Sequence, residues 1–227
     1  MPTEPVISVR GEAVLEVDPE IAVVWVSVLA RDKDRRRAVE ALAERTKQVT
    51  AQIKGFGGAI EKLDSGRVNV QPEFASGKPR ERITGYVAQA SMTATVTDFD
   101  VLGNLVAGLA GQEMVSVNGP GWGLRPGSPV HREARLAAAK DATQRAREYA
   151  EAFGGTVSGL VEAADTGLLT APQPQPQARA VSYAAARLAG GQAGVDDQPE
   201  FDFEPAKQTV TAQVEARFTM TAPTFGQ

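Results

Sequence analysis

The stretch TVTAQVEARFTMT, residues 209–221, alternates apolar and polar side chains along its whole length. Threonine, glutamine, glutamate and arginine stand between its apolar members, which are Val210, Ala212, Val214, Ala216, Phe218 and Met220. A period of two with one polar face is typical of an antiparallel sheet, because parallel sheets are usually covered on both faces. The stretch therefore predicts a long antiparallel strand with one face against a core.

Two other stretches alternate in the same way and predict half-buried strands over residues 6–17 and 83–97. Residues 21–30 differ, because they are nearly all apolar. Such a run is typical of a central strand covered on both faces, or of one whose second face meets a partner. Weaker patterns predict strands near residues 60–70, 113–124 and 157–165.

Two segments between these strands repeat apolar residues at helical spacing. The first covers residues 34–54, with Asp32 or Asp34 as N-cap and Gly55 as the C-cap glycine. The second lies within residues 98–109 and contains Gly103 and Gly108, each of which weakens a helix by about 1 kcal/mol relative to alanine. This second helix must therefore depend on tertiary packing.

The longest predicted helix is rich in alanine and runs from Ser128 to about Phe153. Ser128 suits the N-cap, and Pro129 suits the first helical position. Small side chains on one face permit close backbone approach to a sheet or a second helix. The predicted inner stripe is Ala134, Ala138, Ala142, Ala146, Tyr149, Ala150 and Phe153.

The elements follow the order β-β-α-β and then β-α-β-α-β-β, which predicts an α+β fold. We expect two βαβ-type sheet-and-helix units with antiparallel strands, arising as two similar consecutive halves of a single domain over residues 1–227. The core would comprise residues 6–165 and 206–222. Residues 166–205 are rich in Pro, Gln, Ala and Gly and predict a flexible insertion, because they offer little apolar surface to offset the entropy of ordering.

The bulk composition is that of a globular protein, with 227 residues, 42% hydrophobic and 23% charged. A net charge of −4 argues against nucleic acid as the main partner. The absence of cysteine excludes disulfides, thiolate nucleophiles and cysteine-ligated metals. The N-terminal residues lack a basic region with an apolar run, and no stretch approaches the roughly 20 apolar residues of a membrane span. We therefore expect a cytoplasmic protein without a transmembrane segment.

Three stretches, taken with the closing strand, resemble the SIMPL-domain family, which includes bacterial periplasmic immunogenic proteins. The first is ISVRGEA at residues 7–13 with VDPEIA at 17–22. The second is GYVA at 85–88 leading into VTDFD at 96–100, and the third is the alanine-rich run 134–154. Two positions depart from the family pattern, since its Pro-Asp is Pro19-Glu20 here and its glycine before the last strand is Ala206.

The resemblance implies an α+β fold of two sheet-and-helix units in proteins that assemble into large rings or channel-like oligomers. It also implies a poorly defined function, with links to a signalling kinase, to the bacterial envelope and to oxidative stress. The family provides no catalytic residue or cofactor that can be transferred to this chain.

Ser128, His131 and Glu133 are spaced so that they could act as a nucleophile, a base and an orienting acid on one helical turn. The competing interpretation, which we favour, is that Ser128 caps the helix and His131 is exposed. The glycine-rich stretch 119–127 could hold a phosphate before a helix, but it lacks the P-loop ending and the GxGxxG spacing. A turn or bulge explains its glycines better.

Charged clusters occur at two further places in the chain. The basic run at residues 31–37 is interrupted by Asp32 and Asp34 and lacks interleaved aromatic residues, so we interpret it as a solvated helix start. The acidic stretch 196–204 contains Phe201 and Phe203. It would act as a solvated tether, with these two phenylalanines docking on the domain or on a partner.

The leading hypothesis is thus a non-enzymatic scaffold or binding protein that forms a homo-oligomer. It has no catalytic, cofactor-binding or metal-binding residues, and Phe201 and Phe203 are the candidate partner contacts. One alternative is a small-ligand binder or hydrolase that uses the region from Gly119 to His131. The other is a signalling adaptor that binds through residues 196–204.

Overall fold

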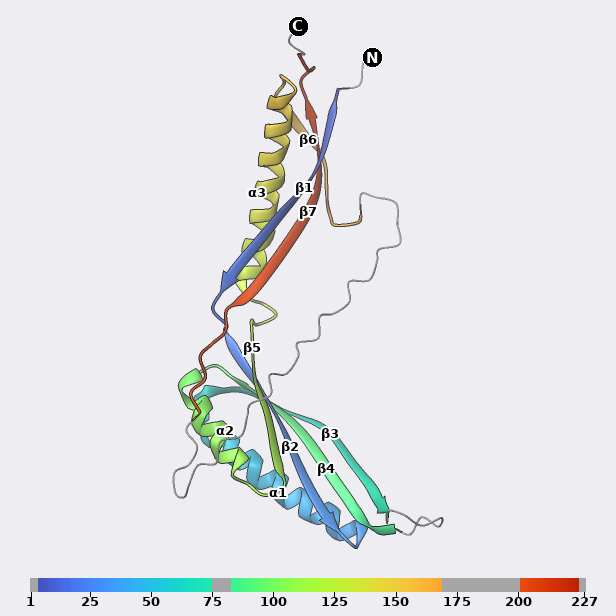
Figure 1. The fold of residues 1–227 in the computed structure, drawn as a ribbon, viewed down its shortest axis with the longest axis vertical. Coiled ribbons are helices and arrows are strands. Elements are labelled where there is room, and N and C mark those ends of the chain that lie inside the picture. Colours follow the sequence, from blue (N-terminus) through green and yellow to red (C-terminus); the bar gives the residue numbers. More distant parts are fainter. Residues whose placement is uncertain (1–3, 75–82, 169–200, 225–227) are drawn as a thin grey trace, which may run out of the picture. The chain divides into compact units, whose positions relative to one another are not determined.

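The computed structural model of the chain describes residues 4–74, 83–168 and 201–224, which form two compact units (Figure 1). Of these residues, 4–17, 126–168 and 209–224 belong to unit 1, and 18–74, 83–125 and 201–208 belong to unit 2. Most of the predicted insertion 166–205 lies outside the described residues. That the chain behaves as a single domain stays a prediction.

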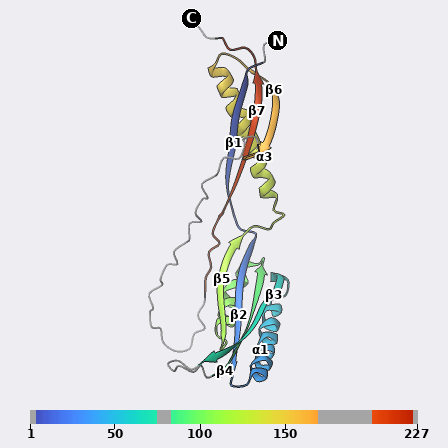
Figure 2. The same ribbon diagram turned by 90° about the vertical axis from the view of Figure 1, so that its right-hand side faces the viewer.

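Unit 2 is a four-stranded antiparallel sheet with the strand order β3-β4-β2-β5. Two helices, α1 and α2, cover the same face of this sheet (Figures 1 and 2). The strands are β2 (Ile21–Asp32), β3 (Ile60–Phe74), β4 (Ile83–Val96) and β5 (Val115–Gly123). The helices are α1 (Arg35–Gly55) and α2 (Leu102–Ala110). A short 3-10 turn, η1 (Gly57–Ala59), follows α1, and another, η2 (Phe99–Val101), precedes α2.

The core of unit 2 lies between the two helices and one face of the sheet. Alternate residues of β2 and β4 point into it and are fully or almost fully buried, as the period of two predicts. From β2 these are Ala22, Val24, Val26, Val28 and Ala30, and from β4 they are Ala88, Ala90, Met92, Ala94 and Val96. The helices add Ala38, Leu42, Val49, Ile53, Leu102, Leu105 and Leu109.

Unit 1 is a three-stranded sheet of order β1-β7-β6 with the single helix α3 against one face (Figures 1 and 2). Its elements are β1 (Val6–Val17), β6 (Val157–Asp165), β7 (Gln208–Met220) and α3 (Pro129–Ala152). Ser128 caps α3 by accepting a hydrogen bond from the Val130 N–H at 3.3 Å. The predicted α+β fold, its element order and its antiparallel strands are confirmed.

Helix α3 and strand β1 pack almost backbone to backbone. The buried stripe of α3 consists of alanines alone, namely Ala134, Ala138, Ala142, Ala146 and Ala150. Opposite them lies Gly11 of β1, where a Cβ would overlap the carbonyl oxygen of Ala138 and come within 2.7 Å of the Ala142 Cβ. Because neither element presents a long side chain at this contact, the helix can sit directly on the strand.

Three details of the sequence interpretation are wrong. Tyr149 and Phe153 are exposed rather than part of the inner stripe, because the stripe repeats every four residues and leaves them on a flank. The left-handed glycine after α1 is Gly57, with φ of 59°, not Gly55. The units are not consecutive halves of the chain, since β1 pairs with the distant β7 and thereby places both chain ends in unit 1.

The close contact at Gly11 gives a stability prediction. Gly11→Ala should lower the free energy of unfolding by about 3 kcal/mol, the upper range for overpacking a core, because the overlapping atoms are backbone and cannot rotate away. Denaturant unfolding followed by circular dichroism measures this value. The matched control is Gly127→Ala in the same unit, where a Cβ meets no atom within 4 Å and stability should not fall. Equal stability of the two variants would contradict the packing argument.

Candidate interaction surfaces

One edge of the unit 1 sheet, strand β1, is capped by side chains of α3. The Asp141 Oδ2 accepts a hydrogen bond from the Glu12 N–H at 2.9 Å, and the Arg145 Nη1 donates one to the Arg10 carbonyl at 3.0 Å. Asp141 and Arg145 also form an ion pair at 3.1 Å, one helical turn apart. The carboxylate and the guanidinium thus replace the acceptor and the donor of a neighbouring strand. The Glu12 N–H and the Arg10 carbonyl are therefore not available to pair with a strand from another molecule.

The opposite edge of this sheet, strand β6, has no such cap. Among the described residues, the only side chain that bonds to its backbone is Thr219, which belongs to the neighbouring strand β7. Two large apolar side chains of β6, Leu160 and Val161, are 60% and 54% exposed. Two register shifts against β7 bend the strand but leave its outer edge accessible within the described structure.

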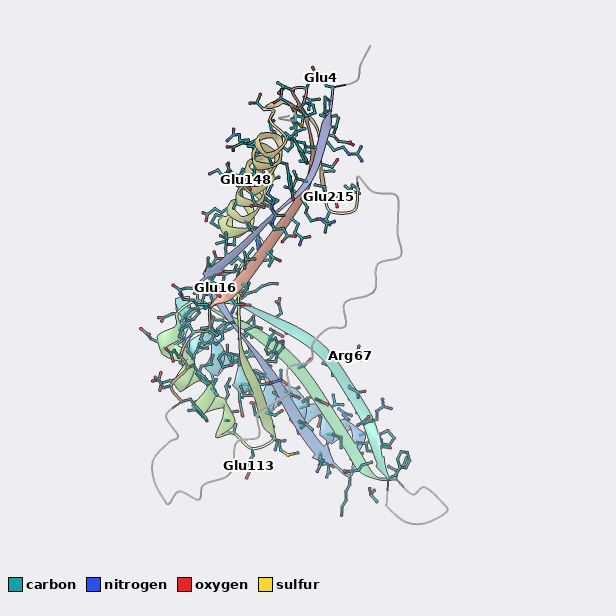
Figure 3. All side chains as sticks on the ribbon, turned by 45° about the horizontal axis from the view of Figure 1, so that its top comes forward. Glu4, Glu16, Arg67, Glu113, Glu148 and Glu215 are labelled. Carbon is teal, nitrogen blue, oxygen red and sulfur yellow. The ribbon has the colours of Figure 1, made fainter. Side chains whose placement is uncertain are left out.

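The face of the unit 1 sheet that lies away from α3 is charged but internally neutralised. Arg10 and Glu215 form an ion pair at 2.9 Å, in which the glutamate is buried with 8% exposure (Glu215 is labelled on β7 in Figure 3). Arg217 lies 3.7 Å from Glu162 on the same face. Arg10, Glu215 and Arg217, together with Glu12, border a hollow of about 450 Å³. Since both signs are present and paired, the hollow does not select a ligand of one charge.

In unit 2, residues 201–207 lie against α2 as an extended segment without secondary structure. A Cβ on Gly103 of α2 would overlap the Phe201 carbonyl oxygen. The glycine that weakens the helix therefore leaves the space in which the backbone of this segment packs. Phe203 packs on the unit 2 core, whereas Phe201 stacks on Phe203 with ring centroids 5.9 Å apart and stays 39% exposed. Docking of the segment on its own domain is thus observed, and a partner contact stays a prediction.

This segment and α2 border a hollow of about 1000 Å³. Asp100, Asp202 and Glu204 line it, together with both phenylalanines. The other predicted acidic residues of the stretch, at positions 196, 197 and 200, lie outside the described residues. Within the described part of the chain, no group of three or more His, Cys, Asp or Glu side chains is arranged to hold a metal ion.

The structure gives Ser128, His131 and Glu133 different degrees of exposure. Ser128 is buried as the helix cap, His131 is half-buried, and Glu133 is exposed to solvent. None of the three lines the hollows described above. Ser128 therefore has the capping role that the sequence predicts for it.

The glycine-rich stretch after Val117 is not a loop, because residues 119–123 continue β5 and pair with β2 beyond a register shift between Val23 and Trp25. The bulge interpretation is thus confirmed. Just beyond β5, the Arg125 guanidinium bonds to Glu61 at 2.6 Å, and its backbone N–H bonds to Glu20 at 3.0 Å. The hydrogen bond to Glu61 and the charges of Glu61 and Glu20 raise the pKa of Arg125 against a smaller desolvation effect.

The basic run at residues 31–37 spans the end of β2, a turn and the first residues of α1, and it is partly paired. Asp34 caps the helix by accepting from the Arg37 N–H at 3.0 Å, Arg36 pairs with Glu40 at 2.9 Å, and Arg31 lies 3.9 Å from Glu73. Such pairing fits the interpretation of a solvated helix start.

Sequence reasoning missed the cap on β1 and the display of Trp25. Asp141 and Arg145 are four residues apart, which is a signal for a helical ion pair but gives no hint that both reach a strand 129 residues or more away in sequence. Residues 21–30 were expected to be covered on both faces or to meet a partner. Within the described structure only one face is covered, and Trp25 on the other face is 46% exposed.

These features define an α+β protein of two sheet-and-helix units, in which the β6 edge is uncapped within the described residues. The model of the SIMPL family, described as "Protein of unknown function (DUF541)", matches residues 7–218. The chain belongs to the SIMPL family.

Two kinds of curated relative agree with this membership. The 26 kDa periplasmic immunogenic protein of Brucella melitensis is 30% identical over 188 residues, which cover 79% of this chain and 73% of the relative. The uncharacterized protein YggE of Escherichia coli K12 is 24% identical over 216 residues, or 92% of this chain and 87% of the relative. The predicted family resemblance is thus confirmed.

A solved amidase of the hydantoinase/carbamoylase family from Burkholderia phymatum matches 58% of this chain and 36% of its own, at 16% identity and a TM-score of 0.28. A likeness this low carries no argument about fold or activity. Among the described helices, none combines the length and apolar character required to cross a membrane.

The docked segment in unit 2 gives a prediction with opposing local and tertiary effects. Gly103→Ala should favour the isolated helix by about 1 kcal/mol, yet it should release residues 201–207 because the new Cβ overlaps the Phe201 carbonyl. Hydrogen exchange by mass spectrometry should show faster exchange in this segment. Gly111→Ala at the end of the same helix, where a Cβ finds ordinary contact at 3.5 Å, is the control. Unchanged exchange in the Gly103 variant would contradict the docking.

The cap on β1 gives a second prediction. Asp141→Ala removes the acceptor of the Glu12 N–H, so the exchange rate of this amide should rise by roughly tenfold, as expected for a hydrogen bond of about 1.5 kcal/mol to a charged group. Residue-resolved NMR exchange measures it. Arg147→Ala, which removes an exposed charge from the same helix, should leave the Glu12 amide unchanged. An unaffected amide in the Asp141 variant would show that the cap does not protect the edge.

Proposed function

We propose that this protein is a non-enzymatic scaffold or binding protein whose copies associate through the outer edge of β6. The observation that carries the proposal is the asymmetry of the unit 1 sheet, in which β1 is capped by Asp141 and Arg145 while β6 is not capped by any described residue. An edge strand with unpaired backbone groups adds another strand readily, and main-chain hydrogen bonds then supply affinity.

The edges of unit 2 are less suited to this kind of pairing. Strand β3 includes Pro72 and the charged residues Lys62 and Asp64, and its register shifts three times against β4. Strand β5 contains Pro120, which has no N–H to donate. Charges, prolines and bulges are the usual means of blocking an edge. Strand β6 also has two register shifts and the charged Glu162 and Asp165, but it has no proline and exposes two adjacent large apolar side chains, Leu160 and Val161.

A second copy of β6 fits this edge better than an arbitrary strand. In an antiparallel pair centred on Val161, this residue faces its own equivalent, Leu160 faces Glu162, and Val157 faces Asp165. The pairing therefore sets no like charges opposite each other, and Glu162 already lies near Arg217 of its own chain. Small residues at positions 158, 159, 163 and 164 allow close approach.

The non-enzymatic part of the proposal is supported by the roles of the candidate residues. Ser128 caps α3, and the glycines from position 119 onward belong to a bulged strand. Both sequence features that favoured a hydrolase or small-ligand binder in the region from Gly119 to His131 thus have structural roles.

A signalling adaptor that binds through residues 201–204 is a second candidate, because Phe201 is exposed beside an acidic hollow. The Gly103→Ala variant discriminates it from the first candidate, since release of the segment would alter binding of such a partner without affecting β6.

Two cellular locations have support, the cytoplasm and the periplasm. The N-terminal residues led to the cytoplasmic expectation, whereas the Brucella relatives carry the word periplasmic in their names. A chain without cysteine is compatible with a reducing and with an oxidising compartment. A link to envelope or oxidative stress, as the family resemblance implies, fits the second location.

Lysine substitutions on β6 test the proposed association. Leu160→Lys with Val161→Lys should reduce the assembly to monomers, because the two copies of residue 161 would set like charges opposite each other and the exposed apolar side chain at position 160 would be lost. Light scattering coupled to size-exclusion chromatography measures the mass. The control is Val14→Lys, which adds a charge at a position of the capped strand β1 that is 66% exposed. A wild-type monomer at high micromolar concentration, or an assembly that survives the double substitution, would refute the proposed interface.

A further inference from the structure

The face of the unit 2 sheet that the helices do not cover carries a shallow hollow of about 320 Å³. Residues from three adjacent strands line it, and they are Trp25, Val26 and Ser27 of β2, Gln89, Ser91, Met92 and Thr93 of β4, and Ser116, Val117 and Asn118 of β5. All of them belong to unit 2, so the site is complete within one compact unit. Its volume lies at the lower end of the range for small-ligand sites.

An exposed indole forms one side of this hollow. Trp25 is 46% exposed although it stands in the middle of the central strand, where its neighbours on the other face are fully buried. Gly121 of β5 makes this possible, because a Cβ there would lie 2.6 Å from the Trp25 Cη2. The ring therefore spreads over the glycine and keeps an accessible face. The glycine-rich end of β5 thus allows the exposure of Trp25 as well as the bulge.

The rest of the hollow is uncharged, and hydroxyl and amide side chains line it together with the apolar residues Val26, Met92 and Val117. In the register of β2 and β5, Ser27 lies opposite Ser116, so that two hydroxyl groups face each other across the strands. Asn118 lies opposite Trp25 and places its amide group next to the indole. Gln89 donates to the Ser27 Oγ at 2.8 Å, which fixes the orientation of both groups. Such side chains both donate and accept hydrogen bonds, and none of the lining residues is Asp, Glu, Lys, Arg or His.

An aromatic ring next to neutral donors and acceptors matches the chemistry of a sugar. A pyranose presents C–H groups on its face, which stack on the electron-rich face of an indole, and hydroxyls around its rim, which bond to serine, threonine, asparagine and glutamine. We propose that the hollow at Trp25 binds a neutral oligosaccharide, with the indole under one sugar ring and the Ser, Thr, Asn and Gln side chains around its hydroxyls.

Other occupants fit this surface less well. Nucleic acid requires cations against its phosphates, and the hollow has none. An obligate interface between copies would be more apolar at its centre than a patch of serine, threonine, asparagine and glutamine. A peptide strand would add to a sheet edge rather than to the middle of a face. The uncharged lining thus favours an uncharged polar ligand.

Titration with defined sugars tests the proposal. The probes are maltohexaose, cellohexaose and chitohexaose, which present neutral glucose or N-acetylglucosamine rings. The chain has two tryptophans, and the other, Trp122, is partly buried against Phe99 at 4.9 Å, so a saturable change in fluorescence reports mainly on Trp25. Isothermal titration calorimetry then measures the dissociation constant of each variant directly.

With at least one of the three sugars, Trp25→Ala should weaken binding by at least about tenfold, and Trp25→Phe should retain part of the affinity because it keeps an aromatic face. Asn118→Ala should weaken binding by about fivefold through the loss of one hydrogen bond. Tyr149→Ala, which removes a similarly exposed aromatic ring from unit 1, should have no effect. Circular dichroism shows that each variant is folded.

Three results would overturn the proposal. The first is the absence of binding by all three sugars at concentrations up to about 10 mM, where even weak sites are partly filled. The second is binding that persists unchanged in Trp25→Ala. The third is a fall in assembly mass in Trp25→Ala, because the exposed indole would then serve a contact between copies. The proposal is independent of the β6 edge, so the lysine variants of β6 should still bind the sugar.

Discussion

The contact between Gly11 of β1 and the alanines of α3 is the constraint on which unit 1 depends. The described residues of this unit form only three strands and one helix, and their core is a small set of side chains around Phe218 and Met220. The helix must therefore approach the sheet as closely as the backbones allow, which excludes any side chain at position 11 and any long one in the alanine stripe. The same closeness brings the flank of the helix, with Asp141 and Arg145, to the outer edge of β1.

Edge protection is thus a by-product of close packing, and it acts on one side of the sheet only. The side chains that cap β1 extend from the helix flank next to it, and no described side chain of α3 bonds to β6. A sheet with one closed and one accessible edge can extend in a single direction. This directionality is what a self-associating protein needs in order to form a defined assembly instead of an open-ended aggregate.

Unit 2 differs from unit 1 because its two helices bury one face of the sheet thoroughly, whereas the other face is open within the described residues. The strand β2 shows the contrast within one element, where Val24 and Val26 are buried and Trp25 between them is displayed. The neutral polar residues around this exposed indole are what make the open face the sugar-recognition surface that we propose. Binding and association would therefore reside on separate units of the chain.

The sequence by itself determined the elements and their order, because the periods of two and 3.6 are local consequences of burying one face of a strand or helix. It also determined the capping role of Ser128 and the family, through short motifs such as those at residues 7–13 and 96–100. Only the tertiary structure decided which strands pair across the chain, and hence that β1 and β7 form one unit with α3. Three features join residues that are distant in sequence. They are the capping of β1 by Asp141 and Arg145, the docking of residues 201–207 over Gly103, and the exposure of Trp25 over Gly121. The local sequence pattern indicates whether a side chain is buried, but it does not indicate which distant residue the side chain contacts. Each of these surfaces depends on such a distant contact.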